Sequence, residues 1–198
     1  EIVSNKSYRN TYRYNTFRNC DGGLTLRMGR YCDVYGNYFL VDNAARTQSY
    51  GVRIVDKGHR VFNNYFEGIL GGSGSVSNME APIILFNGSY ATNDSLNSGI
   101  LNGEYFPADS AIIAYNTTVN AQSSAGIRLG YTNGGANIYQ PKGVKLANNI
   151  IKMADGQAVY LNSSNSQLTY VPEGNLYNAP GGLGLTNSPG FTSNSLSF

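Results

Sequence analysis

Short apolar segments recur along the chain, and a glycine, an asparagine or another polar residue interrupts each after three or four positions. Side chains of different character alternate within them, which is typical of β-strands with two unlike faces. One group of segments carries a polar or aromatic residue at a nearly fixed place. Its members are Leu24–Arg27, Gly51–Ile54, Pro82–Leu85, Gly126–Leu129 and Ala158–Leu161.

A second group of segments places an asparagine before apolar or β-branched residues. From Asn15 to Asn37 is 22 residues, and from Asn37 to Asn64 is 27. Insertions rich in Gly, Ser and Asn lengthen the later repeats near residues 71–80, 87–109 and 130–141. The asparagines that begin these segments are Asn15, Asn37, Asn64, Asn116, Asn149 and Asn175.

Repeats of this length indicate a solenoid or a propeller, but a propeller blade needs about 40 residues and a leucine-rich repeat needs more leucine. We therefore predict an all-β fold: a right-handed parallel β-helix that forms one domain over residues 1–198. It should have about five or six coils of two or three strands each. The recurring asparagines should stack at one corner and form a hydrogen-bonded ladder.

The first residues, Glu1-Ile2-Val3, read as the middle of a strand, with no segment before them to cover the strand edge. We therefore expect further β-helix coils of the same protein to precede this sequence.

Composition narrows the possible partners. Charged residues make up 13% of the 198 residues and the net charge is +2, which argues against a nucleic-acid-binding surface. No apolar run approaches the ~20 residues of a membrane span, so we expect no membrane partner. The only cysteines, Cys20 and Cys32, are predicted to be free thiols rather than a disulfide.

Cations recur at the repeat spacing. Arg27 follows Lys6 by 21 residues and precedes Arg53 by 26, and Arg128 occupies a similar place two coils later. Aligning the coils predicts equivalent or near-equivalent positions for them on one sheet. A solvated row of charges is one interpretation. Because stacked like charges are unfavourable without an anion between them, a row that binds an acidic polysaccharide is the other.

The motifs themselves resemble a known family. Glu1–Ser7, Asn15-Thr16-Phe17, Leu24–Arg27, Gly51–Ile54 and His59–Phe66, taken together with their spacing, are similar to the catalytic half of polysaccharide lyase family 6, the chondroitinase B and alginate lyase family. The motif-level similarity covers about the first 90 residues, and only the coil pattern continues beyond them.

The resemblance implies cleavage of a uronate-containing polysaccharide by β-elimination. Lys6 would be the base that removes the C5 proton, and Arg27 the acid that protonates or stabilises the departing O4. Ca²⁺, with Glu1 as one ligand, would neutralise the uronate carboxylate. Alginate is the favoured substrate and chondroitin or dermatan sulfate the next, and the family suggests a secreted or periplasmic protein.

Further residues receive roles by the same resemblance. Arg53 matches a position that contacts substrate, and Arg128 is a second candidate. The motif places His59 near the implied groove as a substrate-binding candidate; the alternative, a structural role hydrogen bonding to the next coil, is favoured for it. Glu80 precedes Ala81-Pro82-Ile83 in an insertion and is expected at the rim of the cleft.

The chain departs from the family pattern at Met28, where the family has histidine, and the remaining calcium ligands of the family lie before Glu1. One carboxylate is too few for the six to eight oxygens that Ca²⁺ prefers, so we expect weak calcium binding. Glu1 and Lys6 would point to opposite faces of a straight strand, which predicts a bend at Ser4-Asn5.

Two other functions compete with the lyase. A non-catalytic carbohydrate-binding or structural β-helix, as in adhesins and tailspikes, would explain Met28 and the incomplete calcium ligands. A pectin-type lyase or glycoside hydrolase on the same fold ranks last, because a hydrolase needs paired carboxylates that the coils around Arg27 do not supply.

Overall fold

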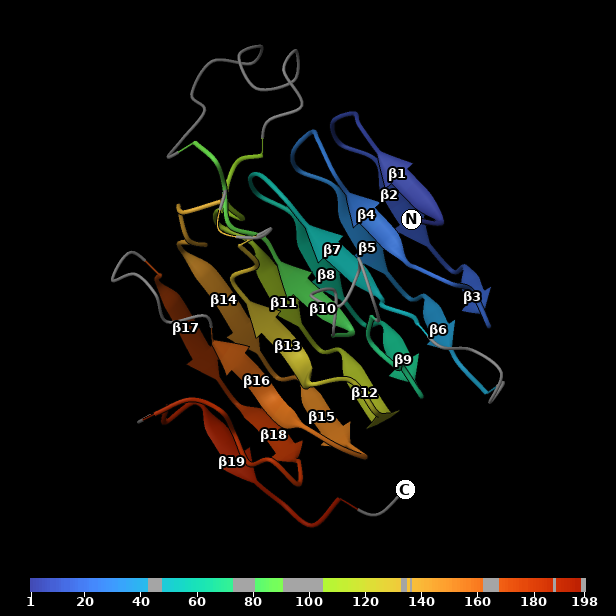
Figure 1. Cartoon of the computed structure of the whole chain (residues 1–198), viewed down its shortest axis with the longest axis vertical. Coiled ribbons are helices and arrows are strands. Elements are labelled where there is room, and N and C mark those ends of the chain that lie inside the picture. Colours follow the sequence, from blue (N-terminus) through green and yellow to red (C-terminus); the bar gives the residue numbers. More distant parts are fainter. Residues whose placement is uncertain are drawn as a thin grey trace.

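A computed structural model describes residues 1–42, 48–72, 81–90, 105–132, 135, 137–161, 168–186 and 188–196. Their regular structure consists of short parallel strands that wind through three sheets in turn, so that each coil contributes one strand to each sheet (Figure 1). No helix among these residues has the length and apolar character needed to cross a membrane.

The first sheet, sheet A, contains six strands, each hydrogen-bonded to the next coil's strand. In spatial order they are β1 (Val3–Asn5), β4 (Leu24–Leu26), β7 (Val52–Ile54), β10 (Ile83–Leu85), β13 (Ala125–Leu129) and β16 (Gln157–Leu161).

Sheet B also has six strands: β2 (Thr11–Arg13), β5 (Asp33–Tyr35), β8 (Arg60–Phe62), β11 (Ile112–Ala114), β14 (Val144–Ala147) and β17 (Tyr170–Glu173). Sheet C has seven: β3 (Thr16–Arg18), β6 (Tyr38–Leu40), β9 (Tyr65–Glu67), β12 (Thr117–Ala121), β15 (Ile150–Met153), β18 (Asn175–Asn178) and β19 (Phe191–Ser193). The predicted all-β parallel β-helix is confirmed.

Apolar residues at alternate strand positions form the core inside the coil. In sheet A, Leu24 pairs with Val52 and Leu26 with Ile54, and all four side chains are fully buried. Phe17, Phe39 and Phe66 stack on one another inside sheet C, with ring centroids 4.7 and 4.9 Å apart. Because side chains of adjacent coils lie directly over one another, the core consists of continuous columns.

The predicted asparagine ladder runs along the corner between sheets B and C. The Nδ2 of Asn37 donates to the Oδ1 of Asn64 at 2.9 Å, and Asn64 donates in the same way to Asn116 at 3.0 Å. The same bond joins Asn15 to Asn37, Asn116 to Asn149 and Asn149 to Asn175.

The residue before each ladder asparagine has a positive φ, between 51° and 64°. That left-handed residue turns the chain sharply from sheet B into sheet C. Glycine or asparagine, which adopt this conformation at low cost, occupy four of the six places. The set is Tyr14, Gly36, Asn63, Tyr115, Asn148 and Gly174.

The insertions near 71–80, 87–109 and 130–141 lie between strands and leave the pairing intact. The first connects β9 to β10, the second β10 to β11, and the third β13 to β14. The strands before and after an insertion still pair with their neighbours, as β10 does with β7 and with β13. Cys20 and Cys32 are free thiols, as expected.

Candidate active site on the outer face of sheet A

The outward side chains in the middle of the sheet A strands form one row. Ser4 pairs with Thr25, Thr25 with Arg53, Arg53 with Ile84, Ile84 with Arg128, and Arg128 with Tyr160. Arg53 and Arg128 therefore share a register two coils apart, as predicted. The predicted alignment of Arg53 with Arg27 is wrong by two residues, because Arg53 pairs with Thr25.

A second outward row begins one residue beyond the strand ends, at Lys6 and Arg27. These residues follow the paired positions Asn5 and Leu26, and the backbone N–H of Arg27 donates to the Asn5 carbonyl at 3.1 Å. Lys6 and Arg27 thus lie on neighbouring coils, which are about 4.8 Å apart. Lys6 is exposed, and no carboxylate among the described residues forms an ion pair with it.

Glu1 joins the two rows. Its Oε1 accepts from Nη1 of Arg27 at 3.2 Å and from Nη2 of Arg53 at 2.5 Å, and the Arg53 side chain is only 5% exposed. Burial is the largest influence on the Glu1 carboxyl and acts to raise its pKa. The hydrogen bond from Ser4 and the charges of Arg53 and Arg27 outweigh burial, so the pKa lies below its ordinary value of 4.5.

The position of Glu1 corrects the predicted bend at Ser4-Asn5. Both of those residues lie inside β1, where they pair with Thr25 and Leu26. Glu1 precedes the strand, so the alternation of strand faces does not apply to it, and its carboxylate reaches the outer face. The Asn5 side chain instead points away from the candidate site and donates to the carbonyls of Ser7 and Met28.

Aromatic rings support all three arginines. The guanidinium carbon of Arg53 lies 4.7 Å from the Phe86 ring centroid, and that of Arg27 lies 5.7 Å from the Tyr105 centroid. Arg128 lies 4.7 Å from Tyr160 and 5.9 Å from Tyr131. Stacking on rings holds a guanidinium in place while leaving its N–H groups directed toward an anion. Nε of Arg27 is buried and has no hydrogen-bond partner among the described residues.

Phe86 and Tyr131 belong to a second apolar cluster, which packs on the outside of sheet A with Ile84 and Val55, and Tyr105 packs against it. The sequence prediction missed Phe86, Tyr105 and Tyr160. Phe86 directly follows β10, so its position in the second row could have been found from the strand motif. Tyr105 lies within the long insertion between β10 and β11, and nothing in its local sequence indicates that it lies beside Arg27.

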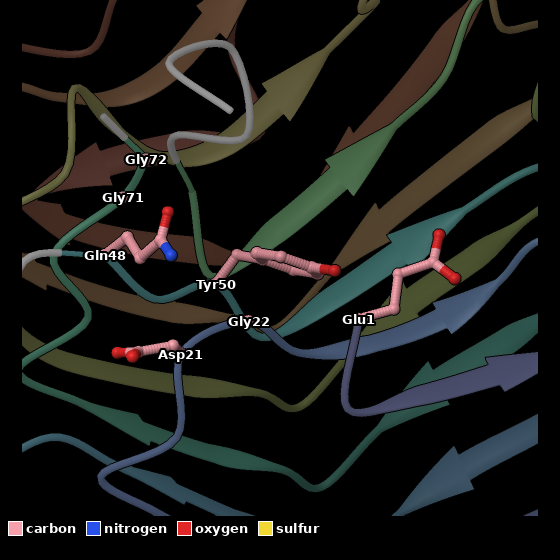
Figure 2. Close-up of a pocket in the computed structure, with 7 residues that line it drawn as sticks. All are labelled: Glu1, Asp21, Gly22, Gln48, Tyr50, Gly71 and Gly72. Carbon is pink, nitrogen blue, oxygen red and sulfur yellow. The ribbon is translucent and has the colours of Figure 1, made fainter. Parts of the chain in front are cut away.

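A hollow of about 70 Å³ lies beside Glu1, between Tyr50 and the turn at Gly71-Gly72. In Figure 2 the Tyr50 hydroxyl points toward the Glu1 side, whereas the Asp21 carboxylate points away from Glu1. The Tyr50 hydroxyl lies 3.3 Å from Oγ1 of Thr25. The two carboxylates at this hollow therefore do not converge on one point.

His59 lies in the interior rather than at the candidate site. Its side chain is 0% exposed, its Nδ1 accepts from the Cys32 N–H at 3.1 Å, and its Nε2 lies 2.9 Å from the Val55 carbonyl oxygen. Burial lowers its pKa from 6.5 to about 4. The substrate contact implied for His59 does not fit this enclosed position, which corresponds to the alternative, a link between neighbouring coils.

Two residues from the sequence analysis remain, Glu80 and Met28. Glu80 lies outside the described residues. Met28 immediately follows Arg27 and is half-buried, and its N–H donates to the Asn5 carbonyl at 3.1 Å.

The described residues contain no group of three or more His, Cys, Asp or Glu side chains that could hold a metal ion. Of the two carboxylates at the hollow, Asp21 points away from Glu1, and two arginines already occupy the Oε1 of Glu1. Six to eight oxygen ligands are normal for Ca²⁺. These residues by themselves do not make a calcium site.

Comparison with known proteins supports the resemblance. The family model of chondroitinase B matches residues 1–197, whereas a comparison with curated proteins finds no match. Among solved structures, the PL6 family alginate lyase AlyGC is 27% identical with a TM-score of 0.77, covering 100% of this chain and 24% of that one.

Two further solved structures share the fold. A mannuronic acid-specific family 6 lyase from human gut microbiota is 22% identical (TM-score 0.71, 96% of this chain and 40% of that one). A PL6 polysaccharide lyase from Pseudopedobacter saltans is 23% identical (TM-score 0.61, 88% and 45%). The chain thus spans less than half the length of these relatives. Because the family model matches nearly every residue, the chain belongs to the chondroitinase B family, among the polysaccharide lyases of family 6.

Proposed function

We propose that this chain carries the base and the acid of a lyase that cleaves a uronate-containing polysaccharide by β-elimination. One observation carries the proposal. Lys6 and Arg27 lie on adjacent coils of one exposed face, beside a carboxylate that already draws Arg27 and Arg53 together. A uronate carboxylate could replace or extend that anion contact, because guanidinium groups bind carboxylates with two N–H donors.

The proposed reaction assigns a separate step to each cation. The Lys6 amine takes the C5 proton, the C5–H electron pair forms a double bond to C4, and the C4–O4 bond breaks. Arg27 hydrogen-bonds the departing O4 and stabilises or protonates it, which gives one unsaturated uronate end and one hydroxyl end. Arg53 binds the carboxylate whose negative charge increases as the C5 proton leaves.

The second cation of the row, Arg128, extends the proposed surface along the β-helix axis. It lies two coils beyond Arg53 and is supported by Tyr160, which is 37% exposed. An extended polyanion such as alginate could contact both arginines. We propose alginate as the first substrate to test and chondroitin or dermatan sulfate as the second, in a secreted or periplasmic setting.

Calcium binding is also proposed, with Glu1 as one ligand. Among the described residues, Glu1 is the carboxylate that pairs with Arg27 and Arg53, and no group of three or more possible metal ligands is found. A calcium site here would need further oxygen ligands. We assign no step of the reaction to the metal.

The test is an assay of the ultraviolet absorbance of the unsaturated product on each polymer. Lys6→Ala should lower cleavage by about 10²–10⁴-fold, the usual contribution of a general base. Lys145→Ala is the matched control, because that lysine lies on sheet B and forms an ion pair with Glu173. Cleavage that persists at the normal rate in Lys6→Ala would exclude Lys6 as the base.

A non-catalytic carbohydrate-binding β-helix is the second candidate, favoured by the lone carboxylate at the cluster. It predicts that alginate binds to the Arg53 surface and that no unsaturated product forms, even at high protein concentration.

A further inference from the structure

The corner between sheets B and C contains an open groove of about 230 Å³, separate from the outer face of sheet A. Gly36 and Asn63, the left-handed turn residues of two successive coils, border it on one side, and the ladder residues Asn37 and Asn64 lie along it. The groove is also lined by three tyrosines, Tyr38, Tyr65 and Tyr115.

The groove is open because small residues occupy the turn position in two successive coils at this corner. Tyr14 and Tyr115 fill this turn position in the coils on either side, whereas Gly36 and Asn63 between them are small. The Tyr14 ring leans over Gly36, so closely that a Cβ on Gly36 would lie 2.8 Å from it. Glycine is thus required at position 36 for both its positive φ and its lack of a side chain.

Tyrosine rings are unusually exposed around this hollow. Tyr38 is 53% exposed and Tyr115 is 58% exposed. Tyr38 pairs with Tyr65 of the next coil, with ring centroids 5.9 Å apart and planes inclined by 55°. Rings on successive coils offer repeated apolar faces with hydroxyl groups at their edges, a combination suited to the C–H faces and hydroxyls of consecutive sugar rings.

One cation near the groove, Arg13, could bind a ligand carboxylate. Arg13 does not line the groove itself, but its guanidinium carbon is 5.7 Å from the centroid of the Tyr14 ring, which packs against Gly36, and its Nη1 donates to the Tyr35 hydroxyl at 3.1 Å. Among the described residues Arg13 has no carboxylate partner, whereas the nearby Arg60 is paired with Asp33. Glu67, two residues after Tyr65 on β9, accepts from the Tyr65 hydroxyl at 3.1 Å, so a ligand carboxylate would have to lie on the Arg13 side, away from Glu67.

We propose that this corner groove is a second binding site for a short segment of uronate-containing polysaccharide, with Tyr38 and Tyr65 stacking on sugar rings and Arg13 binding a carboxylate. The choice of a uronate rests on the proposed function, but the groove itself does not. A second site would hold the polymer on the protein between cleavage events and raise its local concentration at sheet A.

The test measures binding of an alginate hexasaccharide by amide NMR shifts, in the Lys6→Ala background so that the ligand is not consumed. The proposal expects saturable shifts at Asn37, Tyr38 and Asn63 that are independent of those at Thr25 and Arg53. Tyr38→Ala combined with Tyr65→Ala should weaken the corner site by about tenfold or more and leave the sheet A shifts in place.

Two matched variants refine the test. Asn63→Asp adds a negative charge with little change in size or φ preference, and should weaken a uronate oligomer but not a neutral glucan oligomer. Tyr31→Ala removes another exposed tyrosine, 47% exposed and outside the groove, and should change nothing at the corner.

Shifts confined to sheet A, or equal affinity for the neutral oligomer, would overturn the proposal. A dimer that the Tyr38→Ala, Tyr65→Ala variant dissociates in sedimentation would also overturn it, by showing that the groove is an interface between copies. Corner shifts in a chain that forms no unsaturated product would refute only the lyase function.

Discussion

The buried His59 should make the stability of this protein depend on pH. The Cys32 N–H donates to Nδ1, so Nε2 carries the proton and donates to the Val55 carbonyl. Protonating Nδ1 would place two donors face to face in an enclosed site. Burial, which disfavours the charged imidazolium, is the main reason that the His59 pKa falls from 6.5 to about 4.

The sign and the size follow from linkage. Between pH 4 and 6.5 the unfolded chain binds this proton and the folded chain does not, so stability rises with pH and is complete above 6.5. The stabilisation is lost as the pH falls through this window toward 4. At about 1.4 kcal/mol for each pH unit, the loss amounts to about 3 kcal/mol.

The assay is urea unfolding followed by far-ultraviolet circular dichroism at several pH values across the window, for the natural chain and for His59→Gln. Glutamine keeps a donor and an acceptor but does not titrate, so it should lower stability at neutral pH and remove the His59 contribution to the slope. Burial raises the pKa of Asp56 against the opposing hydrogen bond from Arg30, which gives a slope of opposite sign. That slope is common to both proteins and cancels in their difference. A difference that stays constant between pH 4 and 7 would refute the reasoning.

Three further outcomes follow from the structure. Asn64→Ala should lower the free energy of unfolding by about 1–3 kcal/mol, because it removes the acceptor of the buried Asn37 backbone N–H. Asn116 Oδ1 loses the Asn64 Nδ2 donor but keeps the backbone N–H of residue 64. Asn63→Gly, at the adjacent exposed position, is the control, and an equal loss in both would exclude the ladder as the cause. Arg53→Lys should lower cleavage by tenfold or more, since an ammonium cannot both stack on Phe86 and bind a carboxylate in bidentate fashion; wild-type rates would contradict this role. Calorimetry with calcium should detect no binding tighter than about 1 mM, the weak end of calcium sites, and micromolar affinity would refute the single-carboxylate argument.

The strands and the ladder could be predicted because their signals are local. Asparagine before an apolar pair marks the corner, and alternate apolar residues such as Leu24 and Leu26 mark a strand. The role of His59 was harder to predict, since its two backbone partners belong to different coils and only the fold brings Cys32 beside it. Tyr105 shows the same difficulty more strongly, because it reaches Arg27 from within the insertion between β10 and β11.

The error in the alignment of Arg53 has a specific physical cause. Spacing along the sequence suggested that Arg53 repeats Arg27. The register is set instead by the core, because Val52 and Ile54 must point inward and pair with Leu24 and Leu26. That requirement places Arg53 opposite Thr25. Motif spacing alone therefore located the cations on the correct face but misplaced one of them along its strand.

This offset reduces the repulsion between Arg27 and Arg53. Arginines directly opposite each other on adjacent strands would repel at close range. Two positions of offset instead place Thr25 between Ser4 and Arg53 in the first row, and put Arg27 diagonally across from Arg53, within reach of one carboxylate. Within sheet A the register holds although the separation of paired residues varies from 21 residues, Val3 to Leu24, to 44 residues, Ile83 to Ile127. Insertions at the turns can therefore reshape the rim of the face without moving its cations, so differences in substrate preference among such chains should map to the insertions rather than to the strands.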